Sequence, residues 1–218
     1  MPRRIETFFS DADRSAIRAA TADAERRTSA ELVVYVTERC DPHPEVTWKS
    51  TLIGGAVGVM CAAAGDWRFG GWGESGYLWL LIGLQIGFVL GYLASRSDSA
   101  ARRLIDDRAL SSRVEGRAAR AFLEEEVFAT AGRTGILIFV ALFEHRVLVL
   151  RDAGIDERVD PEDWREIADE LASSIRRGAR AKALVRAVER CAELLVERGL
   201  VALDPRNELA DEPRFRHE

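Results

Sequence analysis

Two long apolar segments without charge constrain the fold of this chain more than any other feature of its sequence. Residues 50–65 and 75–95 contain no charged side chain, and a short polar segment, 66–74, joins them. The second segment is 21 residues long, and a helix of about 20 apolar residues crosses the hydrocarbon core of a bilayer. The first segment reaches that length only when flanking residues are included. We therefore expect a two-helix transmembrane hairpin within residues 46–97.

Aromatic residues support this interpretation because they gather near the ends of both segments. Tryptophan and tyrosine prefer the membrane–water interface, where one side of the ring is wet and the other apolar. The residues concerned are Trp48, Trp67, Trp72, Tyr77, Trp79 and Tyr92. The alternative is a hairpin buried in the core of a soluble domain. Soluble helices, however, seldom stay uncharged over such lengths and seldom favour glycine in their interiors.

Small residues recur at every fourth position in each apolar segment. The first segment carries Gly54, Gly58 and Ala62, and the second carries Gly83, Gly87 and Gly91. On a helix each set forms one smooth stripe, and two such stripes let helix backbones approach closely. We predict that these stripes pack the two helices together and that Gln85 faces the partner helix and forms a hydrogen bond there. A homo-oligomer formed through the transmembrane helices is a further expectation, and whether the stripes also take part in it stays open.

The basic residues around the hairpin predict its orientation. Arg39 and Lys49 precede it and five arginines follow it, whereas the joining segment has only Arg68 against two acidic residues. By the positive-inside rule, both termini lie in the cytoplasm and the joining segment lies outside the inner (plasma) membrane. Four of the arginines are also candidates for binding anionic lipid, at about 1 kcal/mol each. These are Arg96, Arg102, Arg103 and Arg108; the alternative is that they only fix the topology.

Composition narrows the classes of function. The chain has 31 Lys and Arg against 36 Asp and Glu, a net charge of −5, which argues against a nucleic-acid-binding protein. Its three cysteines, Cys40, Cys61 and Cys191, form no C-x-x-C pair, as is typical of free thiols in a reducing cytoplasm. Residues 1–28 lack the apolar core of a cleavable signal peptide, so the first apolar segment is expected to direct insertion.

Outside the hairpin, the pattern predicts one α/β domain. We expect helices over 10–27, 98–131, 160–177 and 181–198, and strands over 31–38, 136–143 and 147–150. The first two strands are apolar on both faces, as in a sheet covered by helices on either side. The expected fold class is therefore α/β: a three-layer α/β/α domain with a small mixed sheet, interrupted by the transmembrane hairpin. Its parts are residues 1–45 and 98–203, and residues 204–218 are a flexible tail.

The sequence contains no familiar catalytic motif: neither a P-loop nor a dinucleotide, nucleophile-elbow or zinc pattern is present. The best candidate site is an acidic group after the last strand, formed by Asp152, Asp156, Asp160 and Asp163. Carboxylates gathered at the end of a strand can hold Ca²⁺ or Mg²⁺, and such an ion would polarise a phosphoryl oxygen. The alternative is that Asp160 and Asp163 begin a helix and the other acids are solvated.

Three stretches support a family resemblance. They are TSAELVVYVTERCDPHPE (28–45), GRTGILIFVALFEHRVLVLRDAGID (132–156) and DPRNELAD (204–211). Together with the order of elements between them they resemble the TPM domain family, and above all its membrane-protein branch, in which an apolar hairpin interrupts the domain after its first strand. The resemblance implies a compact α/β/α sheet. Because phosphatase activity with a divalent metal has been attributed to some members, it also implies that Asp152 and Asp11 are metal ligands.

We therefore expect a membrane-anchored, TPM-like domain that acts as a non-catalytic interaction or scaffold module, with the lipid bilayer and an unidentified protein as its partners. One alternative is a phosphatase assisted by Ca²⁺ or Mg²⁺ at Asp152, Asp156 and Asp11. The other is a module that binds anionic lipid through the four arginines named above.

Overall fold

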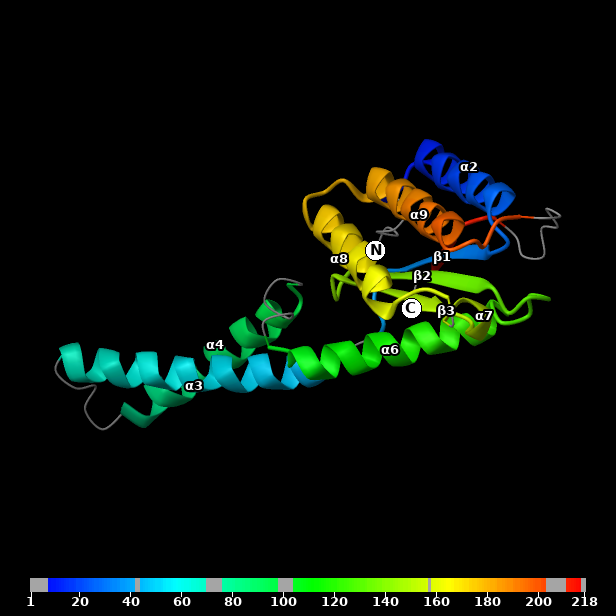
Figure 1. Cartoon of the computed structure of the whole chain (residues 1–218). Helices are drawn as coiled ribbons and strands as arrows, with labels where there is room; N and C mark the ends of the chain where they lie inside the picture. Colours follow the sequence, from blue (N-terminus) through cyan, green and yellow to red (C-terminus); the bar gives the residue numbers. More distant parts are fainter. Residues whose placement is uncertain are drawn as a thin grey trace. The chain divides into compact units, whose positions relative to one another are not determined.

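The apolar strands assemble into one mixed four-stranded sheet in the computed structural model of the chain (Figure 1). The structure describes residues 8–41, 44–69, 76–97, 104–156, 158–202 and 211–216. The strand order is β3-β2-β1-β4, with β1 at Glu31–Thr37, β2 at Gly135–Ala141, β3 at Arg146–Arg151 and β4 at Arg214–Arg216. β1 pairs in parallel with β2, and β2 pairs antiparallel with β3. The predicted mixed sheet is therefore confirmed.

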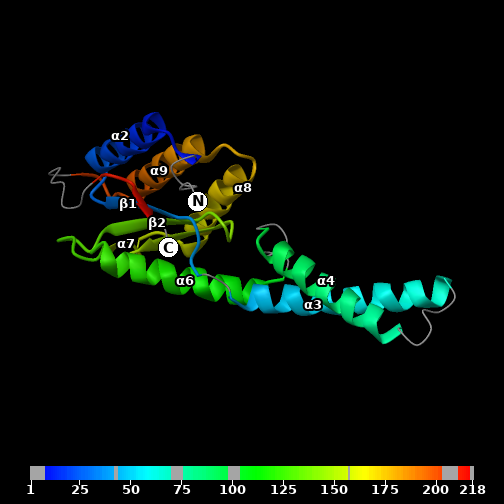
Figure 2. The same cartoon turned by 180° about the vertical axis from the view of Figure 1, so that it is seen from behind.

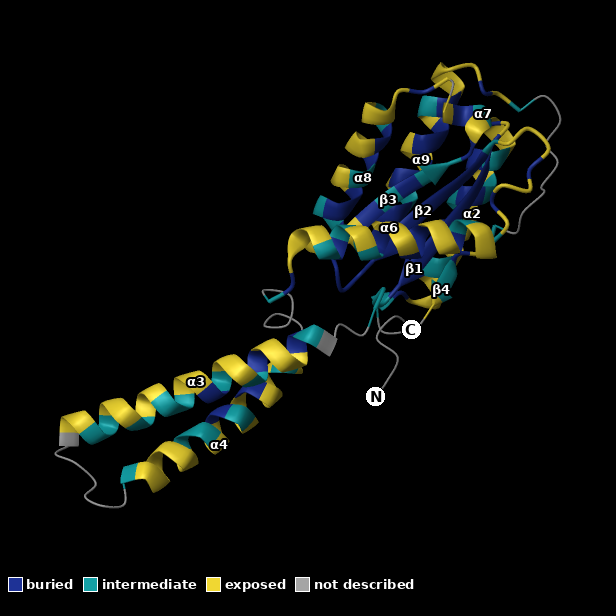
Figure 3. Ribbon diagram, turned by 90° about the horizontal axis from the view of Figure 1, so that it is seen from below, coloured by how far each residue is buried: buried dark blue, intermediate teal, exposed yellow. Residues whose placement is uncertain are grey.

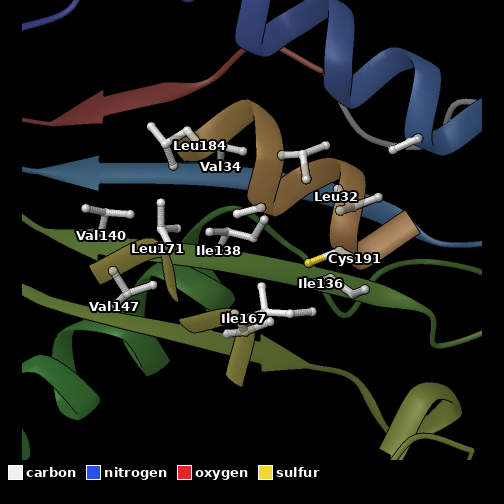
Figure 4. Close-up of a cluster of buried hydrophobic side chains, with 14 of the residues drawn as sticks. Leu32, Val34, Ile136, Ile138, Val140, Val147, Ile167, Leu171, Leu184 and Cys191 are labelled. Atoms are coloured by element: carbon white, nitrogen blue, oxygen red, sulfur yellow. The ribbon is translucent and has the colours of Figure 1, made fainter. Parts of the chain in front are cut away.

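Helices cover both faces of this sheet, as Figures 1 and 2 show. One face carries α2 (Asp11–Arg27), α8 (Pro161–Arg176) and α9 (Arg180–Glu197), and the other carries α6 (Asp107–Glu124). Alternate residues of a strand point to opposite faces. Leu32, Val34 and Ile138 therefore join the cluster under α8 and α9 (Figure 4), whereas Tyr35 and Phe139 pack against α6. The predicted three-layer α/β/α domain is confirmed.

Local signals in the sequence set the starts of two of these helices. The Ser10 side chain accepts a hydrogen bond from the Asp13 backbone N–H, and the Asp13 carboxylate accepts one from the Ser10 N–H at 2.9 Å. This reciprocal capping box satisfies two donors at the start of α2. At α8, Asp160 is the N-cap and Pro161 is the first helical residue, where its missing N–H costs nothing. Both helices therefore start where the sequence predicted.

The chain divides into two compact units. One comprises Met1–Asp41 and Ser111–Glu218, and the other comprises Pro42–Leu110 with the two hairpin helices α3 (Pro44–Phe69) and α4 (Gly76–Ser95). α3 begins earlier than its uncharged segment because Pro44 and Glu45 suit the first turn of a helix. With 26 residues, α3 is long enough to span a bilayer.

Two elements differ from the prediction. The expected helix over 98–131 is the shorter α6, and residues 98–103 lie outside the part of the chain that the structure describes. α6 ends because Glu126 adopts a left-handed backbone conformation, with φ 52°, and the Val127 N–H donates to the Phe122 carbonyl at 3.1 Å. This is a Schellman-type end without glycine, which a sequence does not reveal. The expected loop after β3 begins with a single helical turn, α7 (Ala153–Asp156).

The C-terminal segment also differs, because it contributes the edge strand β4. Arg214–Arg216 pairs in parallel with the end of β1, and the Phe215 ring packs against Phe9 with centroids 5.0 Å apart. Arg214 and Arg216 both form ion pairs with the largely buried Glu125, at 2.8 and 3.2 Å. The expected flexible tail was thus wrong for these residues, whereas 203–210 and 217–218 lie outside the described part.

Candidate functional site

The two hairpin helices pack through the predicted small residues. A Cβ added at Gly87 would lie 2.8 Å from the Gly54 carbonyl carbon, and one at Gly58 would lie 2.9 Å from that of Gly83. Real Cβ atoms essentially never approach a neighbour to under 3.0 Å, so these positions require glycine. Gly83 faces Ala62 and Gly58, and Gly91 faces Ser50. The six predicted residues therefore all make contacts within the hairpin, so the two stripes are not available to bind a second copy of the chain.

The outer surface of the hairpin is apolar and exposed, as Figure 3 shows. Both helices are long and apolar enough to cross a membrane: Glu45–Arg68 has mean hydropathy 1.2 and Gly76–Ser95 has 1.8. Only 17% and 11% of these spans are buried, whereas the core helix of a soluble protein would be mostly buried. The large side chains that cover the outside include Leu52, Val57, Met60, Leu81, Ile86 and Leu90.

Gln85 does not lie where we predicted. Its side chain is exposed, and it forms no hydrogen bond with any residue in the part of the chain that the structure describes. The reason is helical geometry: Gln85 is two residues from both Gly83 and Gly87, and two residues turn a helix by about 200°. The amide therefore lies on the side of α4 opposite the glycines that contact α3. The spacing in the sequence was sufficient to find this.

The described basic residues near the hairpin are exposed or engage neighbours in the same unit. The Arg96 guanidinium donates to the Tyr92 hydroxyl at 2.8 Å and lies over its ring, and the Lys49 ammonium donates to the Leu104 carbonyl at 3.3 Å. Arg108 is exposed. Arg102 and Arg103, like Trp72, lie outside the described residues. Lipid binding by these arginines stays a prediction.

Asp152, the best candidate metal ligand, is held in a structural ion pair. Its carboxylate is 5% exposed and accepts two hydrogen bonds from the Arg133 guanidinium, at 2.5 and 2.7 Å, and one from the Ala153 N–H at 2.8 Å. The hydrogen bond from Arg133 is the main reason that the pKa of Asp152 is lowered. Such a bidentate pair is a strong, charge-assisted contact. Asp152 thus ties the end of β3 to the segment before β2.

The three acids proposed as metal ligands do not come together. Asp156 forms an ion pair with Arg151. Asp152 donates its backbone N–H to Gly135, which pairs with Glu31 at the amino end of β1. Asp11, in contrast, follows Phe9, which packs on Phe215 beside Val36 at the carboxyl end of β1.

The five residue-to-residue steps of the strand from Glu31 to Val36 span about 17 Å. Asp11 and Asp152 therefore lie at opposite ends of the sheet and cannot share one ion. Asp152 also lies at the amino ends of the parallel strands, whereas ligands of open α/β sheets bind at the carboxyl ends. The loop after β3 leaves the sheet at this end because β3 is antiparallel to β2.

The remaining acids of this loop also have structural partners. The Asp160 carboxylate accepts from the Glu162 N–H at 3.0 Å, and Asp163 pairs with Arg198 at 2.6 Å. In the described part of the chain, no three His, Cys, Asp or Glu side chains are grouped so that they could hold a metal ion. The alternative given for Asp160, a helix cap, is the one that the geometry supports.

One carboxyl group with a raised pKa, that of Glu25, was not identified from the sequence. Glu25, on α2, accepts the Leu32 N–H of β1 at 2.9 Å, so it replaces a neighbouring strand at this edge of the sheet. The pKa of Glu25 is raised to about 9, chiefly by burial; the nearby Glu31 and Asp211 also raise it, whereas the Leu32 N–H lowers it. The raised pKa favours the protonated form of Glu25 at neutral pH. Only the tertiary fold places these three acids together.

This carboxyl predicts a pH-dependent effect on stability. Above pH 4.5 the unfolded chain releases the Glu25 proton, whereas the folded chain keeps it until about pH 9. Stability therefore falls as the pH rises through that window. Since Glu25 is partly exposed, we expect Glu25→Gln to stabilise the folded protein at pH 8 by only about 1 kcal/mol.

The check is the melting temperature of the full chain in detergent, which is measured by circular dichroism at several pH values across this range. We expect the gain in Glu25→Gln to vanish at pH 4.5 and below. Asp23→Asn, at an exposed position of the same helix, is the matched control. Equal melting curves for Glu25→Gln and wild type at pH 8 would contradict the prediction.

Comparisons with known proteins identify a fold but no family. No protein-family model matches the chain, and no curated protein matches it. The NMR structure of the BA42 protein from the psychrophilic bacterium Bizionia argentinensis matches with a TM-score of 0.60 and 18% identity, over 99% of this chain and 100% of that chain. At this identity the similarity shows the fold alone. The resemblance to the TPM family stays a prediction.

Proposed function

We propose that this chain is an integral protein of the cytoplasmic membrane, in which α3 and α4 anchor the α/β domain at the cytoplasmic side as a non-catalytic interaction module. The observation that carries the proposal is that the hairpin has small residues inside and large apolar residues on its outer surface, the reverse of a soluble protein. Glycines form its interior and large apolar side chains cover its exterior. In such a pair the glycines pack the two helices against each other. The apolar outer surface is unfavourable in water but favourable in contact with lipid tails.

The positions of aromatic residues support a spanning rather than a surface-bound hairpin. Trp48 and Trp67 are exposed near the two ends of α3 and are 19 residues apart. At 1.5 Å per residue this separation is about 28 Å, close to the thickness of the hydrocarbon core. On α4, Tyr77 and Tyr92 are likewise exposed near opposite ends. The two rings of each helix would thus lie at the two interfaces.

The distribution of charge supports the proposed orientation. Lys49 and Arg96 lie at the hairpin ends that connect to the rest of the chain, and Arg108 follows them. At the opposite end Arg68 lies close to Asp66 in sequence, so little net positive charge remains there. By the positive-inside rule, this distribution favours a cytoplasmic location for the α/β domain.

The geometry of the acids supports an interaction module over a phosphatase. Catalysis with a metal needs several free carboxylates that converge on one point. Asp152 and Asp156 are instead paired with arginines, and Asp11 lies at the other end of the sheet. Because these acids do not converge, we expect the domain to bind a partner protein through its surface and not to hold a catalytic metal.

The test of the anchor is extraction and labelling in cells. We expect the protein to stay in the membrane fraction in alkaline carbonate. A membrane-impermeant maleimide should label Asp66→Cys in intact cells, whereas the wild type, with Cys40 inside and Cys61 within the bilayer, should react only after lysis. Release by carbonate would overturn the anchor, and labelling of the wild type in intact cells would overturn the orientation.

The test of the non-catalytic role is hydrolysis of a generic phosphate ester by the detergent-purified full chain. The assay contains Ca²⁺, Mg²⁺ or a chelator, and Asp152→Asn is measured beside the wild type. We expect equal background rates in every arm. Metal-dependent turnover that is lost in Asp152→Asn would overturn the interaction module and establish the phosphatase alternative.

A further inference from the structure

Gln85 carries the single side-chain amide of α4, and it lies at the middle of that helix. It is nine residues from Gly76 and ten from Ser95. At 1.5 Å per residue, it is about 14 Å from either end. In the spanning orientation proposed above, on which this inference rests, the amide lies near the centre of the bilayer.

The hairpin offers this amide no partner. Gln85 is on the side of α4 opposite Gly83 and Gly87, and no residue in the described ranges hydrogen-bonds to its side chain. An amide in hydrocarbon without a hydrogen bond is unfavourable, because no water is present to replace the bond. Its neighbours on this face, Leu81, Ile82 and Val89, are apolar and exposed. A ligand for this face must therefore be apolar overall and supply one donor and one acceptor at mid-depth.

A second copy of the same chain meets both requirements. The Gln side chain carries a carbonyl acceptor and an NH₂ donor, so two copies related by a two-fold axis can exchange two hydrogen bonds. Copies inserted in the same direction bring their α4 helices together in parallel, with both amides at the same depth. Such an isologous contact is the commonest way in which identical subunits pair.

We propose that the chain forms a dimer in the membrane through the outer face of α4, held by a reciprocal hydrogen bond between the two Gln85 side chains. The glycine stripes do not take part, because they already pack α4 against α3. The proposed dimer contact therefore lies on the opposite side of the same helix from the glycines.

The first experiment measures self-association of the full chain in lipid vesicles by energy transfer between donor- and acceptor-labelled copies, at increasing lipid dilution. We expect the wild type to associate. Gln85→Leu should lower the association constant about five- to thirty-fold, the range measured for polar contacts between model transmembrane helices. Gln85→Asn, which keeps an amide, should retain most of the association, and Val89→Leu should have little effect.

The second experiment locates the interface by disulfide formation at two matched positions. Val89 is 58% exposed and Leu90 is 60% exposed, but they lie about 40° and 140° around the helix from Gln85. In a Cys40→Ser, Cys61→Ala background, with Cys191 buried in the core, Val89→Cys should form linked dimers and Leu90→Cys should not. Adding Gln85→Leu to Val89→Cys should abolish most of the product.

The outcomes separate this inference from the proposed anchor. Vesicle flotation and carbonate resistance report insertion, and their failure would overturn the anchor and the dimer together. An inserted protein that stays monomeric would overturn only the dimer, and would leave the Gln85 face to a helix of another protein. Association that is unchanged in Gln85→Leu, or linkage at Leu90→Cys rather than Val89→Cys, would also overturn the proposed interface.

Discussion

Gly87→Val is expected to destabilise the packing of the two hairpin helices strongly. A Cβ at Gly87 would lie 2.8 Å from the Gly54 carbonyl carbon and 3.0 Å from the Gly55 Cα. Both are backbone atoms, so the helices must separate instead of a side chain moving aside. Overpacking of this kind costs about 3 kcal/mol at the upper end, and each kcal/mol lowers the melting temperature of a chain of this size by about 2–4 °C. We therefore expect a fall of roughly 6–12 °C.

The measurement is the fraction of monodisperse protein left after heating in detergent. Gly65→Val is the matched control, because it lies in the same hairpin and a Cβ there would meet nothing within 4 Å. We expect that variant to melt near the wild type. If both variants melted alike, the close packing of α3 and α4 through their glycines would be contradicted.

Removal of the Arg133 side chain is expected to destabilise the α/β domain, because a buried carboxylate that loses its hydrogen-bond donors is unfavourable. Asp152 is 5% exposed and would lose both of its guanidinium donors. Arg133 has φ 53°, so Arg133→Asn is the better variant, because asparagine tolerates a left-handed backbone. It therefore isolates the ion pair from backbone strain.

The pH dependence of this loss has a definite sign. The folded chain holds the pKa of Asp152 below its ordinary value of 3.8. The stability that the pair contributes is thus present above pH 3.8 and is lost as the pH falls through the lower, folded value. We expect Arg133→Asn and wild type to differ in melting temperature at pH 7 and to converge in acid.

Arg165→Ala provides the comparison, because Arg165 and Glu162 form an ion pair in which both side chains are exposed. Pairs of that kind contribute about 0–1 kcal/mol. A loss in Arg133→Asn no larger than in Arg165→Ala would show that Asp152 does not depend on Arg133. That result would return Asp152 to the candidates for a metal ligand.

Much of the architecture follows from short-range patterns in the sequence. The two uncharged segments, their stripes of small residues and the strands apolar on both faces each identify an element and its buried side, since periodicity along a helix or strand decides which residues share a face. The same rule located Gln85 on the far side of α4, although we first assigned it to the interface.

The candidate metal site could not be judged in this way. Asp152 and Asp11 are both next to predicted elements, and only the antiparallel direction of β3 and the docking of Phe9 on Phe215 separate them by the length of the sheet. Sequence spacing carries no information on which end of a sheet a loop occupies. The pairing of Asp152 with Arg133, 19 residues away, is likewise a consequence of strand pairing.

The sequence by itself determined that this chain has an apolar helical hairpin inserted in an α/β domain, because length, charge and periodicity act locally. The tertiary structure decided which groups are neutralised, which meet and which face outward. Glu25 stays protonated because burial and distant acids surround it, Arg214–Arg216 becomes a strand because β1 has an open edge, and Gln85 faces away because the glycines claim the opposite side. These outcomes depend on contacts between residues far apart in the chain, which local patterns do not encode.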